Sequence, residues 1–538
     1  MLNLTKIATV LLVALGLFGA SPVNAAEDKA KKPAKPAVKK QTRITISKET
    51  TRITEPLRPD GYVDYVAALN AHASRGVTPA SNAAVPLVRV LRLEDVPDAW
   101  RTKAIRMLGV KPSDKKVETF VDLEKFAQPA EKSASPDVDY HEIREQAMSR
   151  PWRKKDHPVI AAWLEKNAPI LDVFTEAVKR PRYYFPLIGG EENSPVTALL
   201  LPSLMESRAA ARALSARAML HAGRGQWDKA RQDLLTCHRL ARHVARGPTL
   251  VEGLVGIAID RVALDTAANI ARHGKLTAAE AKAFQAQISK LPRLVDVVAK
   301  IDLCERYTYL DSVARISRDG IKGLRELMTQ EVKKEDESLP SIVLKLATTV
   351  VIDWNVVCRM GNSAYDRTVK AARLSDATER RKALDNVVEE HKALARRVKD
   401  PKALAKAFLL SKSPRRLVSE QVGGILTILF LPAVSTVVEA EHKAVARGRM
   451  TVTTFALVAY RAEHGAYPRE LAALKGKYLA KIPDDPFANA PIRYRREGKG
   501  FILYSVGRNG RDDKGQTRDE SDGDGGGKKD DLPTKMTR

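Results

Sequence analysis

Helix-length segments with a three- and four-residue hydrophobic period are the feature that most constrains this fold, and the clearest of them occupies residues 195–273. After Pro248 the run TLVEGLVGIAIDRVALDTAANIA is apolar on nearly every side, which is typical of a helix buried in a core. Further helical patterns cover residues 292–330, 341–374 and 377–410. The sequence therefore predicts a mainly α protein whose helical body, of one or more domains, spans residues 57–415.

The segment HAGRGQWDKARQDLLTCHRLARHV predicts a tetratricopeptide-like helix pair within this body. A Gly opens the turn, and small or apolar residues follow at helix-packing positions, namely Gly225, Trp227, Ala230, Leu234 and Cys237. Arrays of such units need about three copies for stability, and no second copy recurs at a fixed period. A lone antiparallel helix pair is the alternative interpretation.

The first 25 residues have the composition of a secretory signal peptide. Lys6 supplies the positive charge, residues 7–20 are nearly all apolar, and Val23-Asn24-Ala25 places small residues at the cleavage position. An uncleaved membrane anchor is the alternative, although the apolar run is shorter than the roughly 20 residues that span a bilayer. We therefore expect residues 1–25 to be a signal peptide that directs export to the periplasm or cell envelope, with membrane association or release left open.

Residues 26–56 are rich in Lys, Ala and Pro, as in KKPAKPAVKK. We expect a disordered basic linker there, because such a segment buries too little apolar surface to fold. The whole chain carries a formal net charge of +26, which attracts polyanions. Export, and the lack of a basic helix with interleaved aromatic residues, argue against a specific nucleic-acid partner. The expected contact of the linker is an anionic envelope polymer or a membrane surface.

No familiar catalytic motif occurs in the sequence. The ten histidines form no HExxH pair, and there is no GxSxG turn, Walker-type loop or GxGxxG followed by a helix. Cys237, Cys304 and Cys358 are widely spaced, so they form neither a disulfide framework nor a metal-binding pattern. No catalytic residue is assigned on this basis, and a non-enzymatic protein is favoured.

Glu252 and Asp260 are the candidates for an alternative, enzymatic function. With Gly256 they recur every four residues, so they share one face of the apolar helix. Two carboxylates there could act as acid and base in a hydrolase of envelope polymers, or they could bind a cation. The other interpretation is structural, namely pairing with nearby arginines such as Arg242, Arg246 or Arg261.

A different organisation begins near residue 423. Gly423 to Val438 is the most apolar stretch after the signal peptide, and at about 16 residues it is either a buried helix or a membrane-inserted one. An amphipathic helix continues to Gly465, and a short helix, RELAAL, follows. The alternating runs IRYRR and FILYSV, joined by EGKG, predict an antiparallel hairpin. We therefore expect a small α+β module at the C-terminus.

The run FALVAYRAEHGAYPRELAALKGKYLAKIPDDPFANAPIRYRREGKGFILYSVGRNG resembles the soluble domain of the major pseudopilin of type II secretion systems. The shared marks are a long helix that stops at an HGxYP-like turn, a DP-aromatic link, and a last strand that runs into YSxGxxG. The resemblance covers residues 424–513, about a sixth of the chain, and implies a pseudopilin-like module over residues 422–512. The rest of the chain resembles uncharacterised exported bacterial proteins.

Pseudopilins of this type hold calcium in the loop after the last strand, so the resemblance implies a calcium ion here. Oxygen ligands in a Gly-rich loop suit this ion. The implied ligands are Ser505, Val506 through its carbonyl, Asn509, Asp512, Asp513, Asp519 and Asp522. Asn509 stands where the family usually has Asp. The alternative is that residues 513–538 form a disordered acidic and Gly-rich tail without a metal.

The position of the module in the chain bears on how it is used. A pseudopilin is cleaved just ahead of an N-terminal hydrophobic helix, whereas here the corresponding helix lies over 400 residues into the chain, behind SPRRLVSEQVGG. Incorporation into a filament is therefore not expected. The sequence predicts an exported binding or scaffold protein of the cell envelope, with a protein partner and a calcium-stabilised docking module; the alternative is an envelope-polymer hydrolase.

Overall fold

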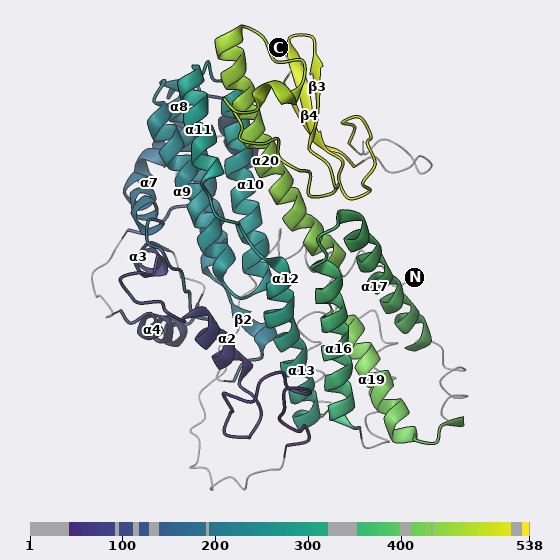
Figure 1. Ribbon diagram of the computed structural model, residues 1–538. Helices are drawn as coiled ribbons and strands as arrows, with labels where there is room; N and C mark the ends of the chain where they lie inside the picture. Colours follow the sequence, from purple (N-terminus) through teal and green to yellow (C-terminus); the bar gives the residue numbers. More distant parts are fainter. Residues whose placement is uncertain are drawn as a thin grey trace.

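The prediction of a mainly α fold is confirmed by a computed structural model of the chain, in which small antiparallel sheets accompany the helices (Figure 1). The structure describes residues 42–91, 96–110, 118–127, 139–189, 193–320, 352–398, 410–431, 434–517 and 530–536. The expected signal peptide, residues 1–25, and the first part of the expected linker lie outside the described residues.

Most of the described residues lie in helices. Their bounds are α2 (Tyr65–Ala73), α3 (Ala84–Val90), α4 (Asp98–Met107), α5 (Leu123–Ala127), α6 (Tyr140–Ser149), α7 (Pro158–Ala177), α8 (Ser203–Gly223), α9 (Trp227–Arg246), α10 (Leu250–His273), α11 (Ala278–Ser289), α12 (Val297–Lys300), α13 (Arg306–Asp319), α16 (Trp354–Ala372), α17 (Ala377–Val398), α19 (Pro414–Phe430) and α20 (Val434–His464). A π-helical turn, Ile301–Glu305, joins α12 to α13, and β1 (Ile188–Gly189) pairs with β2 (Leu199–Leu200).

Two hydrophobic cores lie end to end. Helices α7 to α11 enclose the first, and α13, α16, α17 and α19 surround the second (Figure 1). Helices α10 and α20 pack against each other and belong to both cores. Leu250 and Val434, at the start of these helices, are buried in the second core, whereas Ile270 and Phe455, near their ends, are buried in the first. These two long helices therefore join both cores into one packed body.

The helix pair expected around Gly225 is present as α8 and α9, which pack against each other and against α10. Gly225 has φ +70° in the turn, a conformation that glycine adopts without steric cost. The Thr249 side chain accepts from the Glu252 amide, and the Glu252 side chain accepts from the Thr249 amide, so a capping box begins α10. Similarity to a tetratricopeptide unit remains a prediction.

Gly256→Ala should destabilise the protein by about 1–3 kcal/mol, because a methyl group there overpacks the contact between α9 and α10. The added Cβ would lie 2.6 Å from the Ala245 Cβ and 2.7 Å from the Ala241 carbonyl oxygen. Urea unfolding of the two variants Gly256→Ala and Gly448→Ala checks this. Gly448 lies within α20 with nothing near its added Cβ, so alanine there should stabilise the helix by up to about 1 kcal/mol. Equal effects of the two substitutions would contradict the close approach of α9 to α10.

The expected linker ends earlier than residue 56. Residues 42–56 lie on the second core, and the Ile44 side chain is only 1% exposed. The Thr45 amide donates to the Asn355 side-chain oxygen at 2.8 Å, and the Asn362 side chain donates to the Thr50 carbonyl at 3.0 Å. A disordered linker over the whole of 26–56 is therefore wrong for its last part, because helix α16, some 300 residues away, supplies the partners that this segment lacks locally.

The C-terminal hairpin is confirmed. Strands β3 (Arg493–Glu497) and β4 (Gly500–Ser505) pair antiparallel, and β5 (Leu532–Met536) pairs with the other edge of β4. The expected short helix is a single 3₁₀ turn, Leu471–Leu474. The prediction of a disordered tail over residues 513–538 is wrong for the end of this segment, which forms β5 and returns to the sheet. Strand β4 is buried along its whole length, so its second edge needs a hydrogen-bonding partner, and β5 supplies it.

The module is not separate from the helical body. Helix α20 packs along α10 and α11, where the rings of Phe284 and Phe455 stack with centroids 5.1 Å apart. Lys282 pairs with Glu463 at 2.8 Å across the same contact. One continuous core includes residues of α7 to α11, of α20 and of the sheet. The expected boundary between residues 415 and 422 therefore marks a change of sequence pattern and does not interrupt the packing.

One helical stretch within the described residues, Pro414–His464, is long and apolar enough to cross a bilayer. Within the most apolar window, 56% of the residues are buried by the protein itself. Val422 and Leu426 of α19 lie in the second core, whereas Leu429 on the same helix is half exposed. Core helices of water-soluble proteins meet the same criteria, so this stretch is weak evidence for a membrane span.

Candidate functional site

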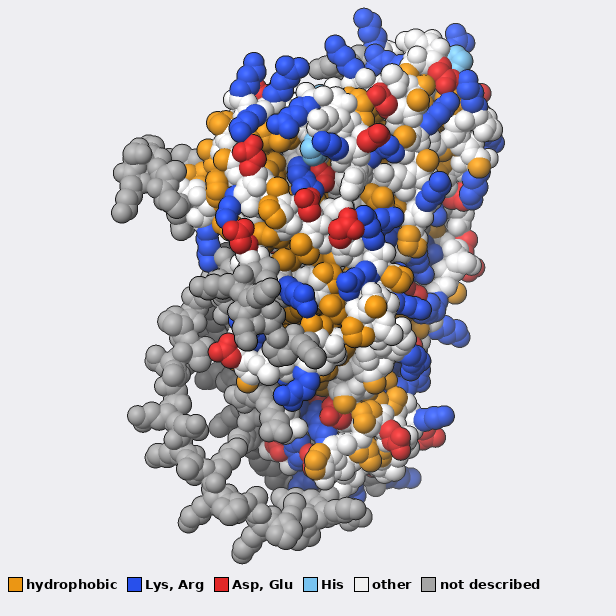
Figure 2. All heavy atoms as spheres, turned by 90° about the vertical axis from the view of Figure 1, so that its left-hand side faces the viewer, with side chains coloured by type: hydrophobic (Ala, Val, Ile, Leu, Met, Phe, Trp, Pro, Cys, Tyr) orange, Lys and Arg blue, Asp and Glu red, His pale blue; other side chains and the backbone are white. Residues whose placement is uncertain are grey.

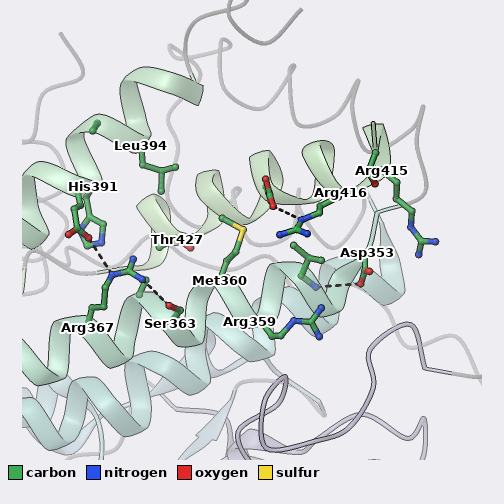
Figure 3. Close-up of a pocket in the computed structure, with 16 residues that line it drawn as sticks. Asp353, Arg359, Met360, Ser363, Arg367, His391, Leu394, Arg415, Arg416 and Thr427 are labelled. Atoms are coloured by element: carbon green, nitrogen blue, oxygen red, sulfur yellow. Dashed lines mark hydrogen bonds and ion pairs between the residues drawn. The ribbon is translucent and has the colours of Figure 1, made fainter. Parts of the chain in front are cut away.

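A groove with a volume of about 950 Å³ lies between α16, α17 and α19 (Figure 3). Asp353 begins α16 by accepting from the amides of Asn355 and Val356, and this cap places one face of the helix along the groove. Apolar side chains from α16 and α17 form much of its lining, namely Val356, Met360, Ala364, Ala393 and Leu394. The walls formed by α16 and α17 therefore both present apolar side chains to the groove.

Arginine side chains line the groove beside this apolar surface. Arg367 pairs with Glu390 at 3.3 Å, and Arg416 pairs with Glu420 at 2.9 Å. The guanidinium groups of Arg359 and Arg415 make no hydrogen bond or ion pair with the part of the chain that the structure describes. Figure 3 shows Arg359 on α16 directed toward the space below α19, and Arg415 at one end of the groove. The groove therefore carries cationic groups that are free to bind acidic side chains.

His391 also lines the groove, from α17. Its pKa is lowered by burial and by the positive charge of Arg367, with Glu390 opposing. The imidazole is therefore neutral at pH 7 and adds hydrogen-bonding capacity without charge. Among the described residues that line the groove, Arg359 on α16 adds an unpaired guanidinium charge.

Of the predicted metal ligands that the structure describes, Ser505 ends β4, and Val506, Asn509, Asp512 and Asp513 lie in the loop that follows. Asp485 accepts hydrogen bonds from the first two. The Ser505 hydroxyl donates to Asp485 at 2.7 Å, and the Val506 amide donates to the same carboxylate at 2.8 Å. Asp485 is fully buried and comes from the DP-aromatic link before the sheet. The Ser505 side chain is therefore engaged within the protein.

The remaining part of this loop brings acidic residues together. The Asn509 side chain donates to Asp513 at 2.9 Å, and its amide donates to Asp530 at 3.1 Å. The amide of Asp530 donates to Asp513 at 3.1 Å, and Tyr504 donates to Asp512 at 2.9 Å. Asp519 and Asp522 lie outside the described residues. The sequence did not single out Asp485, Asp530 or Asp531, because only the return of β5 places the last two beside the loop.

Asp531 is the most perturbed carboxyl of this group. It is 1% exposed and accepts from the Gly515 amide at 2.7 Å, while its second oxygen has no partner among the described residues. Burial, assisted by the negative charges of Asp513 and Asp512, raises its pKa to about 6, although backbone hydrogen bonds from Gly515 and Asp513 oppose the shift. The described residues contain no group of three His, Cys, Asp or Glu side chains arranged to hold a metal ion. The orphaned oxygen suits a cation, but the neighbouring carboxylates are engaged with Asn509 and Tyr504.

Between about pH 4 and 6, the wild-type protein should lose stability relative to Asp531→Asn as the pH rises. The unfolded carboxyl loses its proton near its ordinary value of 3.8, whereas the folded one keeps it to about 6. The folded state therefore binds more protons in this window, and stability falls with rising pH before levelling above it. Urea midpoints across the range measure the difference.

The control for this pH dependence is Asp484→Asn. Asp484 is exposed, and its hydrogen bond with Lys481 lowers its pKa, so its contribution to stability increases with pH. Parallel pH profiles for the wild type and Asp531→Asn would show that the Asp531 carboxyl is not held protonated by the fold.

The two carboxylates of α10 are buried and engaged. Asp260 accepts a hydrogen bond from Arg242 at 2.8 Å, as expected if the carboxylates of this helix pair with nearby arginines. It also forms a hydrogen bond with the His238 ring at 2.7 Å. Within the described residues Glu252 has no arginine partner: it completes the capping box, and burial raises its pKa while the charge of Lys300 opposes that shift. Neither carboxylate lines the groove. The hydrolase alternative needs two acids facing a cleft, and the described residues provide none at Glu252 and Asp260.

Comparison of the chain with protein-family models, curated proteins and solved structures gives no match. The groove and the acidic loop are therefore interpreted from their own residues. The sequence had indicated helices at residues 341–374 and 377–410, but not that their faces meet at a groove. The pair Arg415-Arg416, which follows Pro414 at the start of α19, was the local signal that this face is basic.

Proposed function

We propose that this protein is an exported binding or scaffold component of the bacterial cell envelope, located in the periplasm or at the membrane surface. The signal-peptide pattern of residues 1–25 supports export, and the absence of catalytic motifs in the sequence favours binding over catalysis. The pseudopilin-like unit serves as a docking element built into the helical body. Residues 26–41 supply a basic extension for an anionic envelope polymer or membrane surface.

The groove between α16, α17 and α19 is the observation that carries this proposal. Its apolar walls suit the apolar face of a helix or extended segment, and Arg359 suits an acidic residue on that segment. Aspartate and glutamate would approach a guanidinium that has no competing partner in the described part of the protein. The partner is therefore a protein segment that combines apolar and acidic side chains.

Replacing Arg359 by Glu should weaken partner capture by about tenfold or more, because the groove would then repel an acidic segment. A photo-cross-linking residue at exposed Ser363, which lines the groove, reports capture in intact cells. The matched charge reversal is Arg261→Glu, which alters an exposed pair with Asp265 on α10. The same adduct from a cross-linker at exposed Ser149, or an adduct unaffected by Arg359→Glu, would contradict binding in the groove.

The acidic loop is the proposed calcium site of the docking element. Asn509, Asp512 and Asp513 from the resemblance, together with Asp530 and Asp531 from the fold, are its oxygen donors, and Asp519 and Asp522 are further predicted ligands. Calcium would supply charge neutralisation between these carboxylates. The orphaned Asp531 oxygen supports this assignment.

Calcium should raise the melting temperature more at pH 7 than at pH 5, because binding requires Asp531 to lose its proton. Asp531→Asn should reduce this calcium response, whereas Asp484→Asn should retain it. A response that is independent of pH and of Asp531 would place calcium elsewhere or show non-specific binding.

A further inference from the structure

A cluster of three arginines lies outside the groove and the acidic loop, where α6 packs against α8. Arg208 and Arg212 are four residues apart on α8 and so lie on one face of that helix. Arg144 comes from α6, and it and Arg208 both act electrostatically on Arg212. Figure 2 faces the side of the molecule where α7 and α8 lie and shows Lys and Arg side chains spread over its upper part. This arginine cluster concentrates positive charge at one helix contact.

Arg144 is the unusual member of the arginine cluster. Its residue is only 8% exposed, its Nε atom is shielded from solvent, and this atom has no hydrogen-bond partner. Its guanidinium makes no hydrogen bond or ion pair with the residues that the structure describes. Removing a guanidinium from water costs several kcal/mol unless an anion or hydrogen-bond acceptors replace the lost hydration. The Nε–H group of Arg144 is therefore a buried donor that an anion could satisfy.

Arg212 also lies in an environment where the positive charges nearby act more strongly than the negative ones. It is partly buried, and its pKa is lowered by burial first and then by Arg144 and Arg208. Glu145 and Asp122 oppose this effect without outweighing it. The Asp122 carboxylate also accepts from the Glu124 amide at 3.1 Å, where α5 begins. At Arg212, the two acids therefore do not offset burial and the positive charges of Arg144 and Arg208.

We propose that Arg144, Arg212 and Arg208 form a binding site for a phosphate-type oxyanion between α6 and α8. Guanidinium groups match the geometry of phosphate oxygens with paired N–H donors, and they retain their charge at all physiological pH values. Such an anion would accept from the orphaned Arg144 donor and lower the repulsion between Arg208 and Arg212. Free phosphate and a phosphate ester of a larger envelope molecule carry this same group.

The full-length protein tests the site by titration with inorganic phosphate, against chloride at matched ionic strength. Calorimetry should give one saturable site, and phosphate should raise the melting temperature more than chloride does. Arg212→Gln should weaken phosphate binding at least tenfold. Arg261→Gln, which alters the exposed partner of Asp265, should leave it unchanged. A phosphate response equal to that of chloride, or equal in wild type and Arg212→Gln, would overturn the proposal.

Two further variants keep the test decisive if Arg212→Gln folds poorly. Arg212→Lys retains the charge without the paired donors, so it should bind phosphate with an intermediate affinity. Arg144→Met removes the buried charge. The proposal fails if this variant is more stable than the wild type and the wild type also shows no response to phosphate, because Arg144 would then be a buried charge without a ligand. Tighter binding of glycerol 1-phosphate than of inorganic phosphate would identify an ester as the ligand, and the reverse order would identify free phosphate.

Discussion

Phe455→Ala should lower the free energy of unfolding of the full-length protein by about 3–5 kcal/mol, the range measured for large aromatic side chains removed from closed cores. The Phe455 side chain is fully buried in α20, and its ring stacks on Phe284 of α11 with an angle of 3° between the planes. The substitution removes apolar contacts and leaves a cavity between the helical body and the C-terminal unit, where neither side can collapse freely.

Urea unfolding monitored by circular dichroism measures this loss, with Leu429→Ala as the control. Leu429 is half exposed on α19, so its truncation should cost much less than that of Phe455. The double variant Phe284→Ala, Phe455→Ala should show a coupling of about 0.5–1.5 kcal/mol between the two rings. A separate melting transition for the C-terminal unit, with the helical body intact, would contradict the shared core.

The same shared core determines how the docking element can be studied. Deleting residues 424–538 would remove the C-terminal part of α19 and all of α20, and so expose the surfaces of α10, α11 and α16 that these helices cover. Such a truncation is expected to impair folding of the body as well as docking. Point substitutions in the full chain, as at Arg359 and Asp531, are therefore the appropriate tests of function.

Asp311→Ala should destabilise the protein by about 3–5 kcal/mol, because it leaves a buried arginine without its counter-ion. Asp311 is 1% exposed and accepts from Arg58 at 2.9 Å, from Arg315 at 3.0 Å and from the Val196 amide at 3.0 Å. Its carboxylate thus joins three segments of the second core. Arg58 is buried as well, so water cannot replace the lost partner.

Comparing the free energies of unfolding of Asp311→Ala and Asp265→Ala separates the loss of a buried ion pair from the loss of an exposed one. Asp265 pairs with Arg261 on the surface of α10, and the loss of such an exposed pair costs at most about 1 kcal/mol. Asp311→Asn keeps a hydrogen-bond acceptor and the shape of the side chain but removes the charge. Its free energy of unfolding should therefore lie between those of the wild type and Asp311→Ala. Similar small losses for Asp311→Ala and Asp265→Ala would show that water reaches Arg58 after the carboxylate is removed.

Local sequence patterns predicted most helices and the hairpin of β3 and β4. Hydrophobic periodicity identified α10 as a buried helix, and Gly225 marked the turn between α8 and α9. Alternation in IRYRR and FILYSV identified the strands. These features depend on residues within one or two helical turns or one hairpin, so the sequence carries them directly.

The candidate sites were less predictable. Asn509, Asp512 and Asp513 do fall in one loop, directly after Ser505 at the end of β4, but the fold adds Asp530 and Asp531 just before β5. The groove was not predicted, because it needs the relative placement of three helices. No sequence spacing encodes which helical faces meet when the connections between them are long.

By itself, the sequence determined the helical class, the hairpin and the local caps, because each follows from periodicity and hydrogen bonding between near neighbours. Only the tertiary structure decided the partners of buried charges and of isolated segments. Arg58 meets Asp311 across 253 residues, and Thr45 meets Asn355 across 310. The physical reason is that a charge or an unpaired amide can be satisfied by any suitable partner, and packing of the two cores selects which one comes within reach.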